Sequence, residues 1–188
     1  MHVKVVCHSS LPLAWATSGV GELDHVSVSQ RLRQFDETVS AEDLDNRNHF
    51  VTKVDDFFRP LVEQEKGFPE YAANPDKVML GLHVAWFAGA AIDGGLLVID
   101  PPDEPFFDPI AFRISAEGPV YAAMTAAFPD DALLEGQQFD DACDLAAHFR
   151  HLIQIGAAAE REAQHGRRLM IGGPVDVAHV DRVGARRL

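Results

Sequence analysis

Three side chains on one predicted helix have the chemistry of a metal site. Asp144, His148 and His151 are spaced four and three residues apart in a helix expected over residues 140–165. Such spacing places them on one helix face, where a carboxylate and two imidazoles can bind a divalent transition metal. The alternative interpretation is a solvated face on which Asp144 supports His148. No recognised zinc motif accompanies these residues, which favours the solvated face.

A second candidate is a loop that combines acidic and aromatic side chains. Residues 100–108 are not expected to form regular structure, because their prolines lack backbone donors and restrict the preceding residues. A stiff, acidic and aromatic loop has a composition suited to binding. Alternatively, Phe106 and Phe107 tuck beneath the loop and anchor it to the core. The predicted binding residues are Asp100, Asp103, Glu104, Phe106, Phe107 and Asp108.

Cys7 and His8 end a predicted strand, a place where nucleophiles can be exposed. Neither a Cys-x5-Arg phosphate loop nor a Gly-x-Ser-x-Gly elbow is present, so a structural cysteine is the preferred interpretation. Two cysteines, Cys7 and Cys143, are too few for a disulfide scaffold and indicate reduced thiols in a cytoplasmic protein. Polar residues interrupt the apolar N-terminus, so no signal peptide is expected. The excess of arginine over lysine and the abundant alanine suggest a bacterial source.

The charge is strongly negative and unevenly distributed. The chain of 188 residues carries a formal net charge of −13. Residues 167–188 contain five arginines and two aspartates, so the rest of the chain carries −16. Such a body repels nucleic acid and anionic lipid and attracts basic partners, although the same charge also serves plain solubility. No nucleic-acid or membrane partner is therefore expected.

The longest apolar segment predicts the central element of the fold. Asn74 and Pro75 suit a helix start, residues 78–92 are apolar apart from His83, and Gly94 or Gly95 suits the end. A helix that is apolar all round must be buried, in a protein core or a membrane. The following acidic loop and the interruptions argue against a membrane span. We therefore predict a buried central helix.

The remaining pattern predicts the other elements of an α+β fold in one domain, residues 1–188. Ser40 and Asp43 resemble a capping box before an amphipathic helix that reaches about Val62, with a kink or break at Pro60. Three to four helices should pack with a small, mainly antiparallel sheet built partly from the two chain ends. The C-terminal end should form a hairpin with a turn at residues 181–184. Residues 9–38 have no clear assignment.

These patterns leave two function classes. In the first, the chain is a non-enzymatic protein-binding module whose acidic face neutralises a basic partner, as immunity proteins and antitoxins do. In the second, it is a small metal-assisted hydrolase that uses Asp144, His148 and His151. We favour the first, because the acidic aromatic loop is present and no catalytic motif is complete. We expect no cofactor, and the sequence does not indicate an oligomeric state.

Overall fold

The computed structural model describes residues 5–69, 71, 74–75, 78–109 and 178–187, together with residues 123, 126, 147, 150–151, 153–159 and 161. The chain divides into two compact units, residues 1–110 with 178–187, and residues 111–177 with 188. The first unit contains the strands and helices named below. In the second unit, the described residues between 147 and 161 are helical, within the long helix predicted there. The expectation of a single domain stays a prediction.

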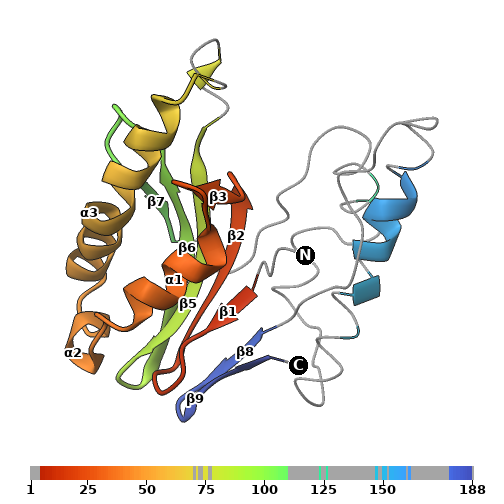
Figure 1. Ribbon diagram of the computed structural model, residues 1–188. Coiled ribbons are helices and arrows are strands. Elements are labelled where there is room, and N and C mark those ends of the chain that lie inside the picture. The colour runs from red at the N-terminus through yellow and green to blue at the C-terminus, as the bar shows by residue number, and fades with distance from the viewer. Residues whose placement is uncertain are drawn as a thin grey trace. The chain divides into compact units, whose positions relative to one another are not determined.

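An antiparallel sheet of five strands forms the framework of the first unit (Figure 1). In spatial order its strands are β1 (Val5–Cys7), β2 (Leu13–Gly19), β5 (Leu80–Ala88), β6 (Ala91–Ile99) and β7 (Phe106–Asp108). Two smaller hairpins accompany it, β3 (Glu22–Leu23) with β4 (Val26–Ser27), and β8 (Ala178–Asp181) with β9 (Gly184–Arg187). With helices packed on this sheet, the predicted α+β class is confirmed.

The predicted central helix over residues 78–92 is wrong, because this segment forms β5 and the start of β6. An apolar run that is buried on both sides satisfies a strand as well as a helix, so periodicity alone does not separate them. Gly89 has a positive φ of 59°, the conformation that a tight hairpin turn requires. The segment still contributes to the core, since Leu82 and Trp86 are fully buried, whereas Ala85 is half-buried.

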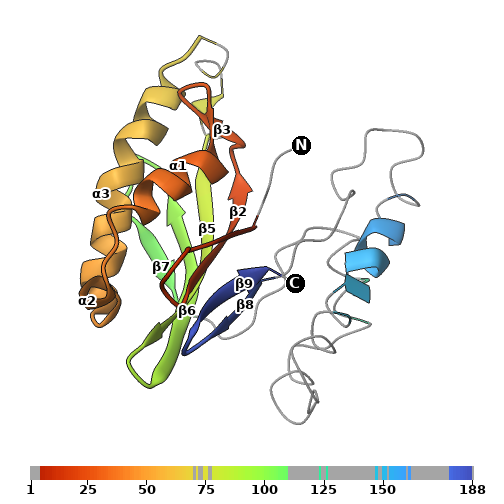
Figure 2. The same cartoon turned by 60° about the horizontal axis from the view of Figure 1, so that its bottom comes forward.

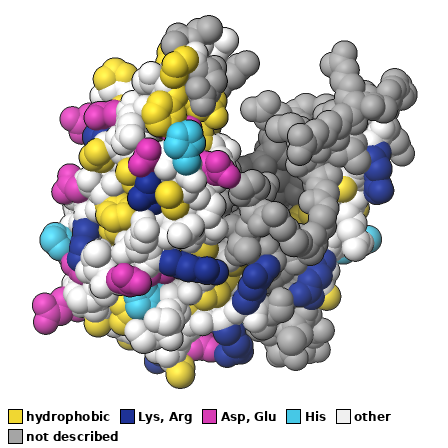
Figure 3. Space-filling model, viewed as in Figure 1, with side chains coloured by type: hydrophobic (Ala, Val, Ile, Leu, Met, Phe, Trp, Pro, Cys, Tyr) yellow, Lys and Arg dark blue, Asp and Glu magenta, His cyan; other side chains and the backbone are white. Residues whose placement is uncertain are grey.

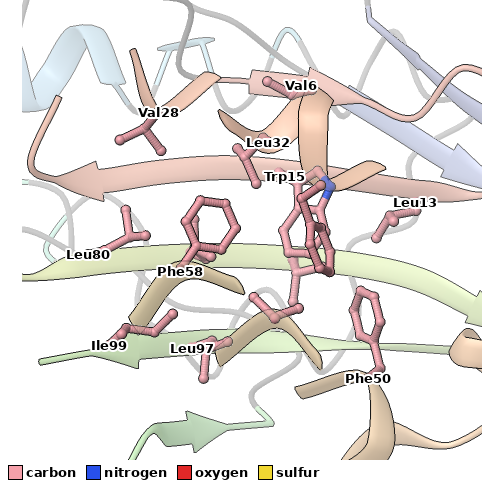
Figure 4. Packing of buried hydrophobic residues seen from close by; sticks show 14 of the residues in the cluster. Val6, Leu13, Trp15, Val28, Leu32, Phe50, Phe58, Leu80, Leu97 and Ile99 are labelled. Carbon is pink, nitrogen blue, oxygen red and sulfur yellow. The ribbon is translucent and has the colours of Figure 1, made fainter. Parts of the chain in front are cut away.

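Three helices cover one face of the sheet: α1 (Val28–Asp36), the short α2 (Ala41–Leu44) and α3 (Arg47–Lys66). Figures 1 and 2 show α1 and α3 on the same side of the sheet, with α3 running along the direction of β5 and β6. Phe50 and Phe58 of α3 point into a core shared with Trp15 of β2 (Figure 4). The ring centroids of Phe50 and Trp86 are 4.9 Å apart. Aromatic packing between helices and sheet therefore dominates this core.

The amphipathic helix predicted to begin near Ser40 is present in two parts. The capping box starts the short α2, and a separate helix, α3, begins at Arg47 and carries the apolar face. Its buried positions include Phe50, Val54, Phe58 and Val62, which follow the spacing of a single helix face. The helix continues through Pro60, so the break considered there does not occur. Tertiary packing along this face offsets the stability that is lost with the hydrogen bond that proline removes.

The hairpin predicted at the C-terminal end is also confirmed, but its strands do not belong to the main sheet. Asp181 Oδ1 accepts hydrogen bonds from the amides of Val183 and Gly184 at 2.9 and 3.1 Å, which fixes the turn. Strand β1, from the other end of the chain, joins the five-stranded sheet, but β8 and β9 form a separate sheet. Only one chain end therefore contributes to the main sheet as described.

Asp43 connects α2 to α3 through a dense set of hydrogen bonds. Its Oδ2 accepts from the Ser40 amide at 2.7 Å and the Ser40 hydroxyl at 2.9 Å, which confirms the capping box. Lys53 Nζ donates to the same oxygen at 2.7 Å, and His49 Nε2 lies 3.1 Å from Oδ1. Burial alone would raise the pKa of Asp43, but the hydrogen bonds from Lys53 and Ser40 outweigh it and lower the pKa well below its ordinary value.

This lowered pKa predicts a pH-dependent loss of stability in Asp43→Asn. A carboxyl with a depressed folded pKa stabilises the protein above its unfolded pKa of about 4, and the contribution disappears as the pH falls further. We expect the variant to lose about 1–3 kcal/mol of unfolding free energy at pH 7 and the difference to shrink towards pH 3. Urea unfolding across this range measures it, with the exposed Asp45→Asn as control. A loss that does not change with pH would contradict the assignment.

Candidate binding surface

The prediction that residues 100–108 form only a loop is wrong for Phe106–Asp108, which pairs with β6 as strand β7. Residues 100–105 form the loop between the two strands, and a lysine of α3 holds its start. Lys66 Nζ lies 2.5 Å from Asp100 Oδ1 and also donates to the carbonyl of Pro101. The Lys66 side chain is only 16% exposed, so this pair is partly shielded from water. Asp100, which the sequence predicted to bind a partner, makes an ion pair within the molecule.

Arg59 of α3 holds the middle of the same loop. Its Nη1 donates to the carbonyl oxygen of Asp103 at 2.8 Å, and its Nε donates to Asp55 Oδ2 at 2.9 Å. The hydrogen bond with Asp55 raises the pKa of Arg59, and the nearby carboxylates of Glu63 and Glu104 act in the same direction. Because Arg59 is engaged through the Asp103 backbone, the Asp103 side chain stays exposed.

The two phenylalanines of the loop have different surroundings. Phe107 pairs with Leu97 on the face of the sheet that the helices cover, and its ring centroid lies 6.4 Å from that of Trp86. The Arg47 guanidinium carbon lies 5.9 Å from the Phe107 ring centroid. Phe106 points to the opposite face and remains 58% exposed. The anchoring interpretation therefore holds for Phe107, while Phe106 is available for contact.

Arg47 also binds Asp93 of β6. Its Nη2 and Nε donate to Asp93 Oδ1 and Oδ2 at 2.8 and 3.0 Å. The hydrogen bond with Asp93 raises the pKa of Arg47. Asp93 in turn accepts from the Gly94 amide at 2.8 Å. This ion pair ties the start of α3 to β6, beside the anchored Phe107.

Together these contacts define a small surface, here called the acidic edge, made of Asp103, Glu104 and Phe106. All three side chains are exposed. Asp108, also predicted to bind, is half-buried and has an interaction within the molecule. The sequence missed the basic side chains that position this loop. Lys66 lies 34 residues before Asp100 and Arg59 lies 44 residues before Asp103, so no local signal in the sequence indicated these contacts.

The metal candidates are not assembled within the described residues. Asp144 and His148 lie outside them, and His151 is helical and exposed. In the part of the chain that the structure describes, no group of three potential metal ligands is present. The hydrolase hypothesis stays a prediction.

Cys7 and His8 have structural surroundings. His8 Nδ1 accepts from the amides of Ser10 and Leu11 at 3.1 and 3.0 Å, and its Nε2 lies 3.0 Å from the carbonyl oxygen of Asp36. These partners assign a neutral ring with the proton on Nε2. Burial raises the pKa of Cys7, which disfavours the nucleophilic thiolate. The structural interpretation of this pair is consistent with these contacts.

Comparison with known proteins yields no family model, curated protein or solved structure that matches this chain. Among the described residues, the helices are too short or too polar to cross a membrane. The class that the structure defines is an α+β protein with a loop fastened to its longest described helix.

Proposed function

We propose that this protein is a non-enzymatic protein-binding module that captures a basic partner at the acidic edge. The observation that carries the proposal is the anchored loop: Lys66 and Arg59 hold its backbone while Asp103, Glu104 and Phe106 remain exposed. A surface held in place before binding loses less conformational entropy when a partner docks. We also propose a bacterial cytoplasmic setting. The low cysteine content favours the cytoplasm, and the excess of arginine over lysine with abundant alanine favours a bacterial source.

The composition of the acidic edge supports this kind of recognition. An exposed aromatic ring offers apolar area that stays rigid, and aromatic residues are enriched at protein interfaces. The adjacent carboxylates supply the complementary charge for lysine or arginine of a partner. Charge of this kind acts mainly on the association rate and on specificity. The negative charge of the whole chain, −13, extends the attraction beyond the edge itself.

The proposal is tested with the full chain and four matched variants. Tagged wild-type protein, Asp103→Lys/Glu104→Lys, Phe106→Ser, Glu22→Lys/Glu42→Lys and Ile92→Ser are used for capture from a lysate of the source organism, and captured proteins are identified by mass spectrometry. Glu22 and Glu42 are exposed acids outside the loop, so their reversal changes the net charge equally. Ile92 is 65% exposed and serves as the control for loss of an apolar side chain.

We expect wild type and both controls to capture the same basic protein and both edge variants to lose it. With the purified partner, charge reversal at the edge should lower the association rate constant by about tenfold or more, and added salt should lower the wild-type rate towards that of the variant. Equal capture by the edge variants, salt-independent association, or the absence of any specific partner would each contradict the proposal.

A further inference from the structure

The β8–β9 hairpin carries the opposite charge to the acidic edge. Its ten residues contain three arginines and one aspartate. Arg182 and Arg187 are exposed, and the Arg186 side chain is 60% exposed although it lies 3.2 Å from Asp181. Figure 3 shows Lys and Arg side chains grouped in the lower middle of the molecule, where Figure 1 places β8 and β9. The hairpin is therefore a compact basic surface on an acidic protein.

An apolar side chain accompanies the charge on each of the two surfaces. Val183, in the turn between β8 and β9, is 92% exposed. Phe106 holds the corresponding place beside the carboxylates of the acidic edge, with 58% exposure. Each surface thus combines charged groups with one exposed apolar group, and the two charges are opposite.

The two surfaces lie at opposite ends of β6, so they cannot meet within one molecule. Arg182 Nη2 donates to the carbonyl oxygen of Ala90 at 3.1 Å, just before β6 begins. The loop of the acidic edge begins directly after Ile99, where β6 ends. A strand of nine residues is roughly 30 Å long. Contact between these surfaces therefore requires two molecules.

We propose that the β8–β9 hairpin of one molecule docks on the acidic edge of a second copy, so that the chain associates head to tail. Arg182 and Arg186 would meet Asp103 and Glu104, and Val183 would meet Phe106. The two surfaces differ, so the contact is heterologous and generates a ring or an open chain of molecules. This inference rests on the proposed function only in that it uses the same acidic edge. The basic group that docks there is the hairpin of a second copy and not a separate basic protein.

A second copy fits the hairpin better than an extended polyanion does. A nucleic acid or an anionic membrane presents negative charge over a wide area, and the acidic remainder of this chain would be repelled by it. A second copy is acidic as well, but at physiological salt charges more than about 8 Å apart are largely screened. The attraction between arginines and carboxylates in close contact is then stronger than the screened long-range repulsion between the two molecules.

A charge-swap experiment tests this contact by analytical ultracentrifugation at physiological salt. We expect the weight-average mass of wild type to rise above 20.6 kDa with concentration. Asp103→Lys/Glu104→Lys and Arg182→Glu/Arg186→Glu should each remain monomeric, because each variant opposes like charges across the contact. A mixture of the two variants should associate again, since every contact between unlike molecules then pairs opposite charges. Circular dichroism checks that each variant is folded.

Two charge-matched controls separate local contact from total charge. Glu22→Lys/Glu42→Lys and Arg33→Glu/Arg161→Glu change the net charge equally at exposed positions outside both surfaces, and both should associate like wild type. Monomeric wild type at every concentration, or swap variants that do not recover on mixing, would overturn the inference. If wild type is monomeric while capture of a different basic protein still needs Asp103 and Glu104, the proposed function stands and only the self-association fails.

Discussion

Replacing Trp86 by alanine should lower the free energy of unfolding by about 3–5 kcal/mol, as truncation of large core residues does. Trp86 belongs to β5, the strand between β2 and β6, and its side chain is fully buried. Its ring contacts Phe50 and Phe107. Its indole Nε1 also donates to the carbonyl oxygen of Leu44 at 3.0 Å. The substitution therefore leaves a cavity and removes the hydrogen bond that ties α2 to the sheet. Because small domains are stable by only about 5–15 kcal/mol, the melting temperature should fall visibly.

Two further variants make the Trp86 prediction specific. Trp86→Phe keeps an aromatic ring but not the N–H donor, so its loss should be clearly smaller than that of the alanine variant. Ile92→Ala removes an apolar side chain from β6 at a position that is 65% exposed, and it should change the stability by less than about 0.5 kcal/mol. Urea unfolding monitored by circular dichroism measures all three. A wild-type stability for Trp86→Ala would refute the assigned core.

Replacing Gly95 by valine should detach β7 and the acidic edge from the sheet. A Cβ atom at Gly95 would overlap the carbonyl oxygen of Asp108 and lie 2.9 Å from Phe107 Cζ. Since the overlapping atom belongs to the backbone, the strand itself must shift. Overpacking of this kind costs about 1–3 kcal/mol, and here it also disrupts the contact of Phe107 with Trp86.

Hydrogen exchange separates this local effect from general destabilisation. Amides of β7 and their partners in β6 should exchange faster in Gly95→Val, whereas those paired between β2 and β5 should keep their protection. Gly21→Val is the matched control, because a Cβ at Gly21 meets no atom within 4 Å. Unchanged protection of β7 in Gly95→Val would show that Phe107 and Asp108 do not lie over this glycine.

Local signals in the sequence were sufficient where an element depends on its own residues. The amphipathic face of α3, the capping box from Ser40 to Asp43 and the turn after Asp181 were all predicted, and all are present. In each case the deciding interactions lie within a few residues along the chain. The α+β class follows from these elements, because an amphipathic helix and the neighbouring strands must bury their apolar faces in one shared core.

Tertiary structure decided what depends on residues distant in the chain. Residues 80–88 form strand β5 because their backbone pairs with β2 and β6 while their buried side chains pack into the core shared with α3, a condition that an apolar run does not specify. In the sequence, all side chains of the acidic loop looked equally able to bind a partner. In the structure, Lys66 and Arg59 fix part of the loop, and only some of its side chains stay exposed. The sequence by itself thus determined composition, charge and local elements. Which charges are free to bind was decided only by the fold, because an ion pair depends on separations of a few ångströms between residues far apart in sequence.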